Sequence, residues 1–361
     1  MSVAAQFSVE FIQCLSPEGT LTGTASLLAT DFTALRDLFQ RMLYLRVFDT
    51  KAIALQRTGK LGTYASALGH EAAHVGIGSS LLPQDCFAPM YREYGAQFYR
   101  GVKPRHVLMY WGGDERGNLF AGANSELGAL HDFSWCVPIS TQCLHAAGAA
   151  MAFKYRGEPR VALAVCGDGG TSKADFYGAI NIAGAQQLPL VLVIVNNQYA
   201  ISVPCASQTG AKTLAQKGIA SGLRSIQADG NDILAVRAVL DDAVAQARAG
   251  GGASVVELVT YRLGDHTTAD DARRYRADAE VKHAWTLEPM LRLRRYLTEA
   301  GYWSEAIEQS WLLECGADID AEVNAYLKLA PPPISAMFDY QFAELPHDLR
   351  AQRAAAMAQL V

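Results

Sequence analysis

One stretch near the middle of the chain, residues 161–202, restricts the fold more than any other part of the sequence. Its first apolar run, Val161 to Cys166, and its last, Leu190 to Val195, are each six residues long and rich in valine. Such runs are typical of strands that are buried on both faces of a parallel sheet. Between them, Thr171 or Ser172 can cap a helix that Pro189 stops. The stretch therefore predicts two parallel strands joined by a helix.

Glycines and polar residues follow both predicted strands. The carboxyl ends of parallel strands meet at one edge of a sheet, where open α/β proteins bind ligands. Glycine lets the backbone approach a phosphate, and a helix start offers free N–H groups to an anion. A carboxylate near a phosphate needs a cation between them, and carboxylate, amide and carbonyl oxygens suit Mg²⁺. The predicted binding residues are Gly167, Asp168, Gly169, Gly170, Asn197 and Tyr199, with Asp168, Asn197 and the Tyr199 carbonyl as metal ligands.

The order of these residues resembles the thiamine diphosphate signature, in which GDG is followed after a fixed gap by NN. Here Asn197 lies 29 positions after Asp168. An ordinary dinucleotide-binding turn is the alternative, but that fingerprint requires glycine at the position of Ser172 and an acid near Gln187. The resemblance implies thiamine diphosphate and Mg²⁺ as cofactors and a thiamine diphosphate-binding fold of the diphosphate type.

Two further segments resemble the alpha subunits of the first component of 2-oxo acid dehydrogenases. Tyr91 and Arg92 follow a proline turn. A loop arginine is usually solvated, but the resemblance implies that Tyr91 contacts the cofactor and that Arg92 grips the diphosphate, which suits a planar guanidinium. The turn CVPISTQ at residues 136–142 would otherwise be assigned to the core. The resemblance places Val137 and Ile139 against the aminopyrimidine, with Ser140 nearby.

A third segment of the same family resemblance follows residue 260. A lone loop histidine is more often structural than catalytic. Here the order of Tyr-Arg, histidine, paired aspartates and a second Tyr-Arg resembles a loop of the family, which implies that Arg262 touches the diphosphate. It also implies that His266 faces the reacting end of the cofactor as the catalytic residue, since imidazole can move protons near neutral pH.

The segment His70-Glu71-Ala72-Ala73-His74 matches the HExxH pattern of zinc proteases. On a helix the two histidines would share one face, as a metal requires. A metzincin also needs glycine and histidine three and six positions later, where this chain has Ile77 and Ser80, and Glu93 lies beyond two prolines. We therefore interpret the pattern as a packed helix start with Glu71 near its positive end.

The remaining pattern predicts an α/β fold, with a mostly parallel sheet flanked by helices on both faces and a helical C-terminal region. We expect a long helix capped by Asp31, strands at 224–228 and 254–262, and a helix at 233–248. Three parts are predicted: an N-terminal arm (1–30), a diphosphate-binding domain with associated helices (31–330), and a tail (331–361) that packs on the domain or a partner.

Composition excludes several classes of protein. A net charge of −5 over 361 residues gives no basic footprint for nucleic acid. The seven cysteines are scattered and form no CxxC pair, so they are interpreted as reduced thiols. The sequence shows no apolar run of membrane-spanning length and no targeting signal at the N-terminus, so we expect a cytoplasmic protein without a membrane partner.

The family resemblance implies an oxidoreductase that decarboxylates a 2-oxo acid and transfers the acyl group to the lipoyl arm of a second component. One set of strands carries the diphosphate residues, and no second α/β domain for the aminopyrimidine is visible. We therefore predict an α2β2 heterotetramer with a beta subunit. Pyruvate is preferred because it is the commoner substrate, and 3-methyl-2-oxobutanoate and acetoin are alternatives. A non-catalytic scaffold and a single-chain thiamine diphosphate enzyme remain competing hypotheses.

Overall fold

The core of the protein, in a computed structural model that describes residues 2–23, 27–119, 130–339 and 341–358, is a six-stranded sheet. Its strand order is β1-β7-β8-β4-β3-β2, and all neighbouring strands are parallel. This confirms the predicted α/β class. The strands are β1 (Glu10–Ile12), β2 (Cys86–Ala88), β3 (Ala162–Gly167), β4 (Leu190–Asn196), β7 (Arg224–Asp229) and β8 (Ser254–Val259), and a separate antiparallel ribbon pairs β5 (Tyr199–Ala200) with β6 (Val203–Pro204).

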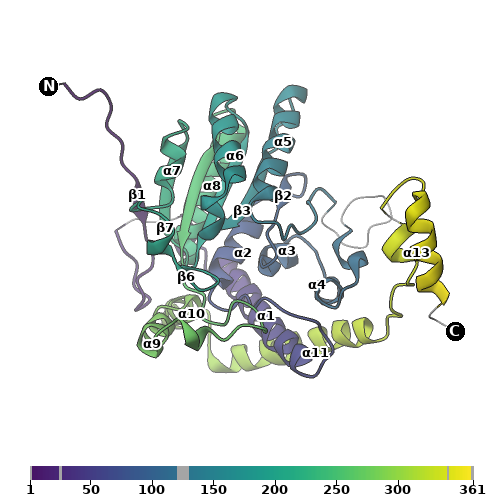
Figure 1. The fold of residues 1–361 in the computed structure, drawn as a ribbon. Helices are drawn as coiled ribbons and strands as arrows, with labels where there is room; N and C mark the ends of the chain where they lie inside the picture. The colour runs from purple at the N-terminus through teal and green to yellow at the C-terminus, as the bar shows by residue number, and fades with distance from the viewer. Residues whose placement is uncertain (1, 24–26, 120–129, 340, 359–361) are drawn as a thin grey trace.

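Helices cover both faces of the sheet. Helices α5 (Thr141–Arg156) and α6 (Ala174–Ala185) pack on one face, and α2 (Glu71–Ser80) and α8 (Ile233–Arg248) pack on the other (Figure 1). Within the described residues, no helix combines the length and the apolar character that crossing a bilayer requires. The other helices are α1 (Phe32–Arg57), α3 (Tyr94–Tyr99), α4 (Pro104–Trp111), α7 (Gln216–Ile219), α9 (Asp278–Thr286), α10 (Pro289–Glu299), α11 (Glu305–Leu327), α12 (Ala336–Asp339) and α13 (His347–Ala358).

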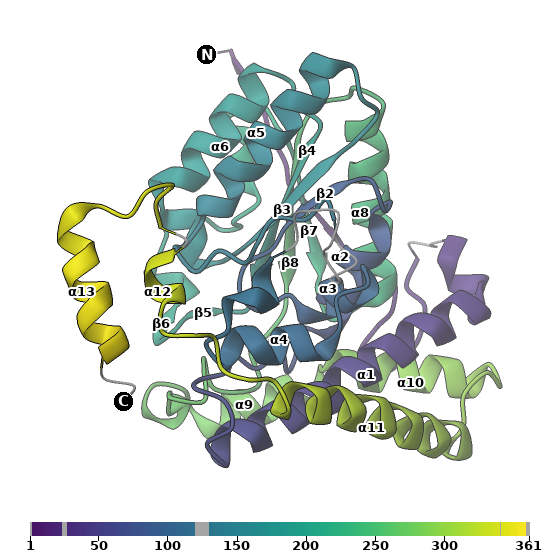
Figure 2. The ribbon, with the colours of Figure 1, turned by 90° about the vertical axis from the view of Figure 1, so that its right-hand side faces the viewer.

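The C-terminal segment lies apart from the sheet. After α11, the chain leaves the helices around α1 and ends in α13, which stands away from the body of the domain in both views (Figures 1 and 2). No residue of α12 or α13 is buried. The helical C-terminal region is thus present as predicted.

Strands β3 and β4 are apolar along their whole length because both of their faces are buried. Leu163 and Val165 of β3 lie in the core beneath α2 and α8, and Ala162, Ala164 and Cys166 lie beneath α5 and α6. The two strands pair in step, from Ala162 opposite Leu190 to Gly167 opposite Val195. The turns that follow the two strands therefore begin side by side.

Some element boundaries differ from those predicted. Helix α6 begins at Ala174, not at residue 171 or 172, because a 3-10 turn, Gly169–Ser172, comes first. The Thr171 hydroxyl donates to the Asp168 carbonyl at 2.7 Å within this turn and caps no helix. Strand β8 ends at Val259, short of Arg262, because its neighbours β4 and β7 end opposite that residue.

The N-terminal segment contributes to the sheet through β1, a strand that the sequence analysis did not predict. The Asp232 carboxylate accepts hydrogen bonds from the backbone N–H groups of Cys14 and Leu15, each at 2.6 Å. Arg292 of α10, 2% exposed, donates to Asp229 at the end of β7 at 2.6 Å and to the Leu15 carbonyl at 3.0 Å. One buried guanidinium thus joins the N-terminal segment, the sheet and α10.

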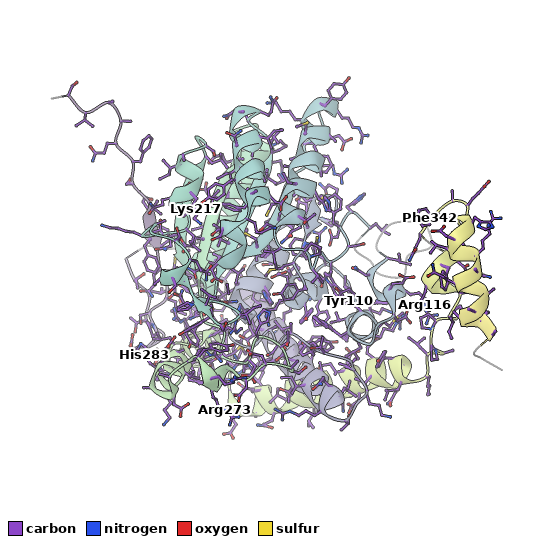
Figure 3. The ribbon with its side chains drawn as sticks, in the orientation of Figure 1. Tyr110, Arg116, Lys217, Arg273, His283 and Phe342 are labelled. Carbon is purple, nitrogen blue, oxygen red and sulfur yellow. The ribbon has the colours of Figure 1, made fainter. Side chains whose placement is uncertain are left out.

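We predict that Arg292→Met lowers the free energy of unfolding by about 3–5 kcal/mol, because it leaves the buried Asp229 carboxylate without its cation. Urea unfolding followed by circular dichroism measures this loss. The control is Arg273→Met, which removes an ion pair with Asp271 at the outer edge of the molecule (Figure 3), where the arginine side chain is 83% exposed. An equal loss in both variants would contradict the assignment.

Helix α2 begins in the core, with two fully buried histidines in its first turns. Both ring nitrogens of His74 lack a hydrogen-bond partner within the described part of the chain. Burial, with a smaller contribution from Arg92, lowers the pKa of His74 to about 3. The ring is therefore neutral in the folded protein near pH 7. In an unfolded chain it would take up a proton below about pH 6.5.

Replacing His74 by phenylalanine should change the pH dependence of stability. Because the folded pKa lies below the unfolded one, this histidine destabilises the fold as the pH falls below 6.5. On going from pH 7 to pH 5, we expect the free energy of unfolding of His74→Phe to rise by about 2 kcal/mol relative to that of wild type. Urea midpoints at the two pH values measure the difference. The control is His347→Phe, which replaces an exposed histidine. The same gain in this variant would refute the explanation.

Candidate functional site

A cavity of about 600 Å³ opens beside the carboxyl ends of β3 and β4. Residues outside the predicted set, among them Trp111, Lys173 and Ile201, also contribute to its wall. Ser140 and Arg262 are the predicted residues that do not line it. The eleven predicted residues that do are Tyr91, Arg92, Val137, Ile139, Gly167, Asp168, Gly169, Gly170, Asn197, Tyr199 and His266.

The glycine turn after β3 is tightly packed. A Cβ atom on Gly169 would lie 2.6 Å from the Ala200 side chain, and one on Gly170 would lie 2.8 Å from the Ser140 hydroxyl oxygen. The Ser140 hydroxyl is buried and donates to the Gly170 carbonyl at 2.7 Å. Ser140 therefore holds the turn from behind, and larger residues at the two glycines would displace their neighbours.

Asp168 is a buried carboxylate, 2% exposed. Burial raises its pKa, and the hydrogen bond from Gln208 opposes this shift. The Gln208 amide donates to Asp168 Oδ2 at 2.7 Å. Within the described ranges, no ion pair to Asp168 is present. A buried carboxylate without a counterion is unfavourable, so this residue suits a site that receives a cation.

Asn197 and Tyr199 lie just after the end of β4, beside the glycine turn that follows β3. Asn197 Oδ1 is 3.3 Å from the backbone nitrogen of Tyr199, and its Nδ2 is 3.2 Å from His70 Nε2. The Tyr199 carbonyl accepts from Arg262 Nη1 at 3.1 Å. A carbonyl oxygen has a second lone pair, so this hydrogen bond leaves it able to bind a cation.

Arg262 lies behind the cavity wall, fully buried. Besides Tyr199, its guanidinium donates to the Ile201 carbonyl at 2.7 Å and to the Tyr275 hydroxyl at 2.8 Å. Burial, and then the nearby Arg92, lower its pKa. Arg262 thus supports the segment that carries the Tyr199 carbonyl, and its positive charge lies behind Tyr199, which lines the cavity.

Arg92 and His266 form the other side of the cavity. Arg92, 2% exposed, donates to the Ser66 carbonyl and, at 2.9 Å, to the His266 carbonyl. The His266 ring lies edge-on to Tyr91, with centroids 6.1 Å apart. Burial lowers the pKa of His266 to about 3, and Arg92 and Arg262 add to the shift. The ring is therefore neutral near pH 7 and can accept a hydrogen bond.

Two residues that the sequence analysis did not identify contact the glycine turn. One is Gln208, through Asp168. The other is Lys217 of α7, which is buried and whose ammonium donates to the Thr171 hydroxyl at 2.8 Å and to the Thr171 carbonyl at 3.0 Å. These contacts join positions 40 and 46 residues apart in the sequence, so no local sequence pattern predicts them.

The HExxH segment forms the packed helix start that was predicted. Helix α2 begins at Glu71, whose carboxylate pairs with Arg46 at 2.8 Å. The His70 and His74 rings share a face and stack 5.5 Å apart. His70 uses both ring nitrogens, toward the Ala67 carbonyl and Asn197. Across the described residues, no group of three or more His, Cys, Asp and Glu side chains is arranged to hold a metal ion.

Comparison with known proteins identifies the family. The sequence profile described as "Dehydrogenase E1 component" matches residues 39–332. The chain is 40% identical over 355 residues to "3-methyl-2-oxobutanoate dehydrogenase subunit alpha" of Mycobacterium tuberculosis, covering 98% of this chain and 95% of that protein. It is 36% identical over 351 residues to "Pyruvate dehydrogenase E1 component subunit alpha" of Staphylococcus aureus, covering 96% and 92%. A protein of the same name from Acholeplasma laidlawii is 38% identical over 310 residues, covering 84% and 87%.

These matches span the cavity, its two strand turns and the segments that support them. The family resemblance inferred from the GDG turn, the Tyr-Arg pair and the His266 segment is therefore confirmed. The chain belongs to the dehydrogenase E1 component family, as an alpha subunit of a 2-oxo acid dehydrogenase.

Proposed function

We propose that this chain supplies the diphosphate half of an active site that decarboxylates a small 2-oxo acid and passes the acyl group to a lipoyl arm. One observation carries the proposal: eleven of the thirteen residues predicted from sequence line a single cavity at the carboxyl edge of β3 and β4. Membership of the E1 family implies thiamine diphosphate as the cofactor. That cofactor, when bound, supplies a nucleophilic carbon and a ring that accepts the electrons released with carbon dioxide.

The donor groups around the cavity fit a magnesium diphosphate. Asp168, Asn197 and the Tyr199 carbonyl would hold the cation, because carboxylate, amide and carbonyl oxygens are its preferred ligands. Arg92 and Lys173 bring positive charge to the cavity wall, and Arg262 adds charge from behind it. The glycine turn offers backbone N–H groups to the phosphate oxygens.

His266 is proposed to act at the reacting end of the site. Its pKa is lowered to about 3 by burial and by the two arginines, so the imidazole is neutral near pH 7 and offers a hydrogen-bond acceptor. The ring would orient the substrate or act as an acid or base at acyl transfer. The backbone N–H of His266 donates to Asp270 at 2.9 Å, and this contact fixes the segment that carries the ring.

We also propose that a beta subunit completes the site in an α2β2 assembly. Val137 and Ile139 line the cavity as apolar side chains, yet they are 51% and 38% exposed in this chain. Apolar groups beside a cofactor cavity are normally covered, which a partner subunit would accomplish. The relatives named above are all alpha subunits, and this supports the same arrangement.

Asp168→Ala tests the cation site. In the assembled complex we expect the affinity for Mg²⁺, in the presence of thiamine diphosphate, to fall by at least about 100-fold, because the site loses its charged ligand. Titration followed by tryptophan fluorescence or calorimetry measures the affinity. Asp241→Ala, a charge-matched change at a side chain of α8 that is 47% exposed, is the control. Wild-type affinity in Asp168→Ala would reject the metal assignment.

Pyruvate is the substrate that we propose, and 3-methyl-2-oxobutanoate is the second candidate. The first choice follows the commoner substrate of the family. The second is favoured by the 40% identity to the Mycobacterium tuberculosis relative, whose name specifies that acid. Acetoin is a third candidate.

Co-expression with a beta-type subunit decides between them. We expect kcat/KM for pyruvate to exceed that for 3-methyl-2-oxobutanoate by at least about 10-fold, since a few methyl groups in an apolar pocket are worth that much. Lipoyl-dependent acyl transfer and acetoin turnover are assayed in parallel. A preference for the branched acid would establish the second candidate. Turnover by the alpha chain alone would contradict the heteromeric assignment.

A further inference from the structure

His70, the first histidine of the HExxH segment, contacts the proposed metal site. The residue is fully buried, and its Nε2 lies 3.2 Å from Nδ2 of Asn197. These two residues are 127 positions apart in sequence. The contact raises the question of which atom carries the hydrogen, since both an imidazole nitrogen and an amide can be oriented in two ways.

The surroundings of His70 determine its tautomer. Its Nδ1 lies 3.2 Å from the carbonyl oxygen of Ala67, which can only accept, so Nδ1 carries the hydrogen. The ring is fully buried and forms no ion pair with a carboxylate among the described residues, so a positive charge on it would be unfavourable. The ring is therefore neutral, and Nε2 is left as an acceptor.

Because Nε2 of His70 accepts a hydrogen bond, the Asn197 amide must point its NH₂ group toward it. The amide oxygen, Oδ1, must then lie on the other edge, where it is 3.3 Å from the backbone nitrogen of Tyr199. A rotated amide would turn its NH₂ group toward the cation, and NH₂ is no ligand for Mg²⁺. We propose that His70 is a positioning residue that fixes the Asn197 amide with its oxygen toward the divalent cation of the thiamine diphosphate site. The inference rests on the cation site proposed above.

The turn that carries His70 is itself held rigidly. Gly69 has φ +92°, and a Cβ there would lie 2.3 Å from the Tyr261 carbonyl oxygen. The Gly69 carbonyl accepts from the Thr260 hydroxyl at 2.7 Å, just after β8. The His70 ring also stacks on His74, with centroids 5.5 Å apart and planes inclined by 17°. The imidazole is thereby presented to Asn197 in one orientation.

The test is Mn²⁺ binding to the assembled complex with saturating thiamine diphosphate, measured by the electron paramagnetic resonance of free Mn²⁺. His70→Phe keeps a ring against His74 but removes the acceptor. We expect its Kd for Mn²⁺ to rise about 10-fold, the effect typical of removing a group that orients a metal ligand. His70→Gln restores an acceptor oxygen, so its Kd should stay within about 3-fold of wild type.

The matched control is His74→Phe, in the next turn of the same helix, whose ring nitrogens have no hydrogen-bond partner within the described residues. Its Mn²⁺ affinity should equal that of wild type. Wild-type affinity in His70→Phe, or equal losses in His70→Phe and His74→Phe, would overturn the proposal. If His70→Phe does not assemble, His70→Met replaces it with the same expectation. Asp168→Ala is measured alongside: if it binds Mn²⁺ like wild type, the metal site has failed, and not the role of His70.

Discussion

The in-step parallel pairing of β3 and β4 is the constraint on which the site depends. Gly167 and Val195 are paired at the ends of the two strands, so the glycine turn and the Asn197 turn begin one strand spacing apart. Strand β8 lies on the other side of β4 and delivers the segment from Thr260 to His266 to the same edge. Loss of this register by one residue would exchange the side chains that the shifted strand presents to the two helical layers and would offset the two turns.

The charges at this edge are arranged for a ligand that carries both signs. Arg92 and Arg262 are buried and bonded mainly to carbonyl oxygens and a tyrosine hydroxyl, and within the described residues neither forms an ion pair with a carboxylate. Asp168 is buried with a raised pKa and a neutral amide as its partner. Two arginines and one aspartate that form no ion pair within the described residues suit an anion that binds together with a divalent cation. A magnesium diphosphate has that composition.

Much of this arrangement could be predicted from local sequence, and the rest depends on contacts that no local pattern encodes. The valine-rich runs revealed β3 and β4 because both faces of each strand are buried. Strands β1 and β2 have three residues each, too few to show a period. Gln208 and Lys217 act through hydrogen bonds that span 40 and 46 residues, so their spacing carries no signal. Arg262 was predicted at the right edge, but its burial behind Tyr199 follows only from the packed structure.

The groups that support the proposed ligands are neutral, and this has a physical reason. Gln208 bonds Asp168 and His70 bonds Asn197, each with a neutral side chain. A lysine in place of Gln208 would form a buried ion pair with Asp168 and compete with a metal for its charge. A protonated His70 would demand the amide oxygen and remove it from the cation. Support by neutral hydrogen bonds orients both ligands while leaving the carboxylate charge and the amide oxygen available. His70 itself is held neutral by its burial beside His74 and Arg92, which lowers the pKa of its ring.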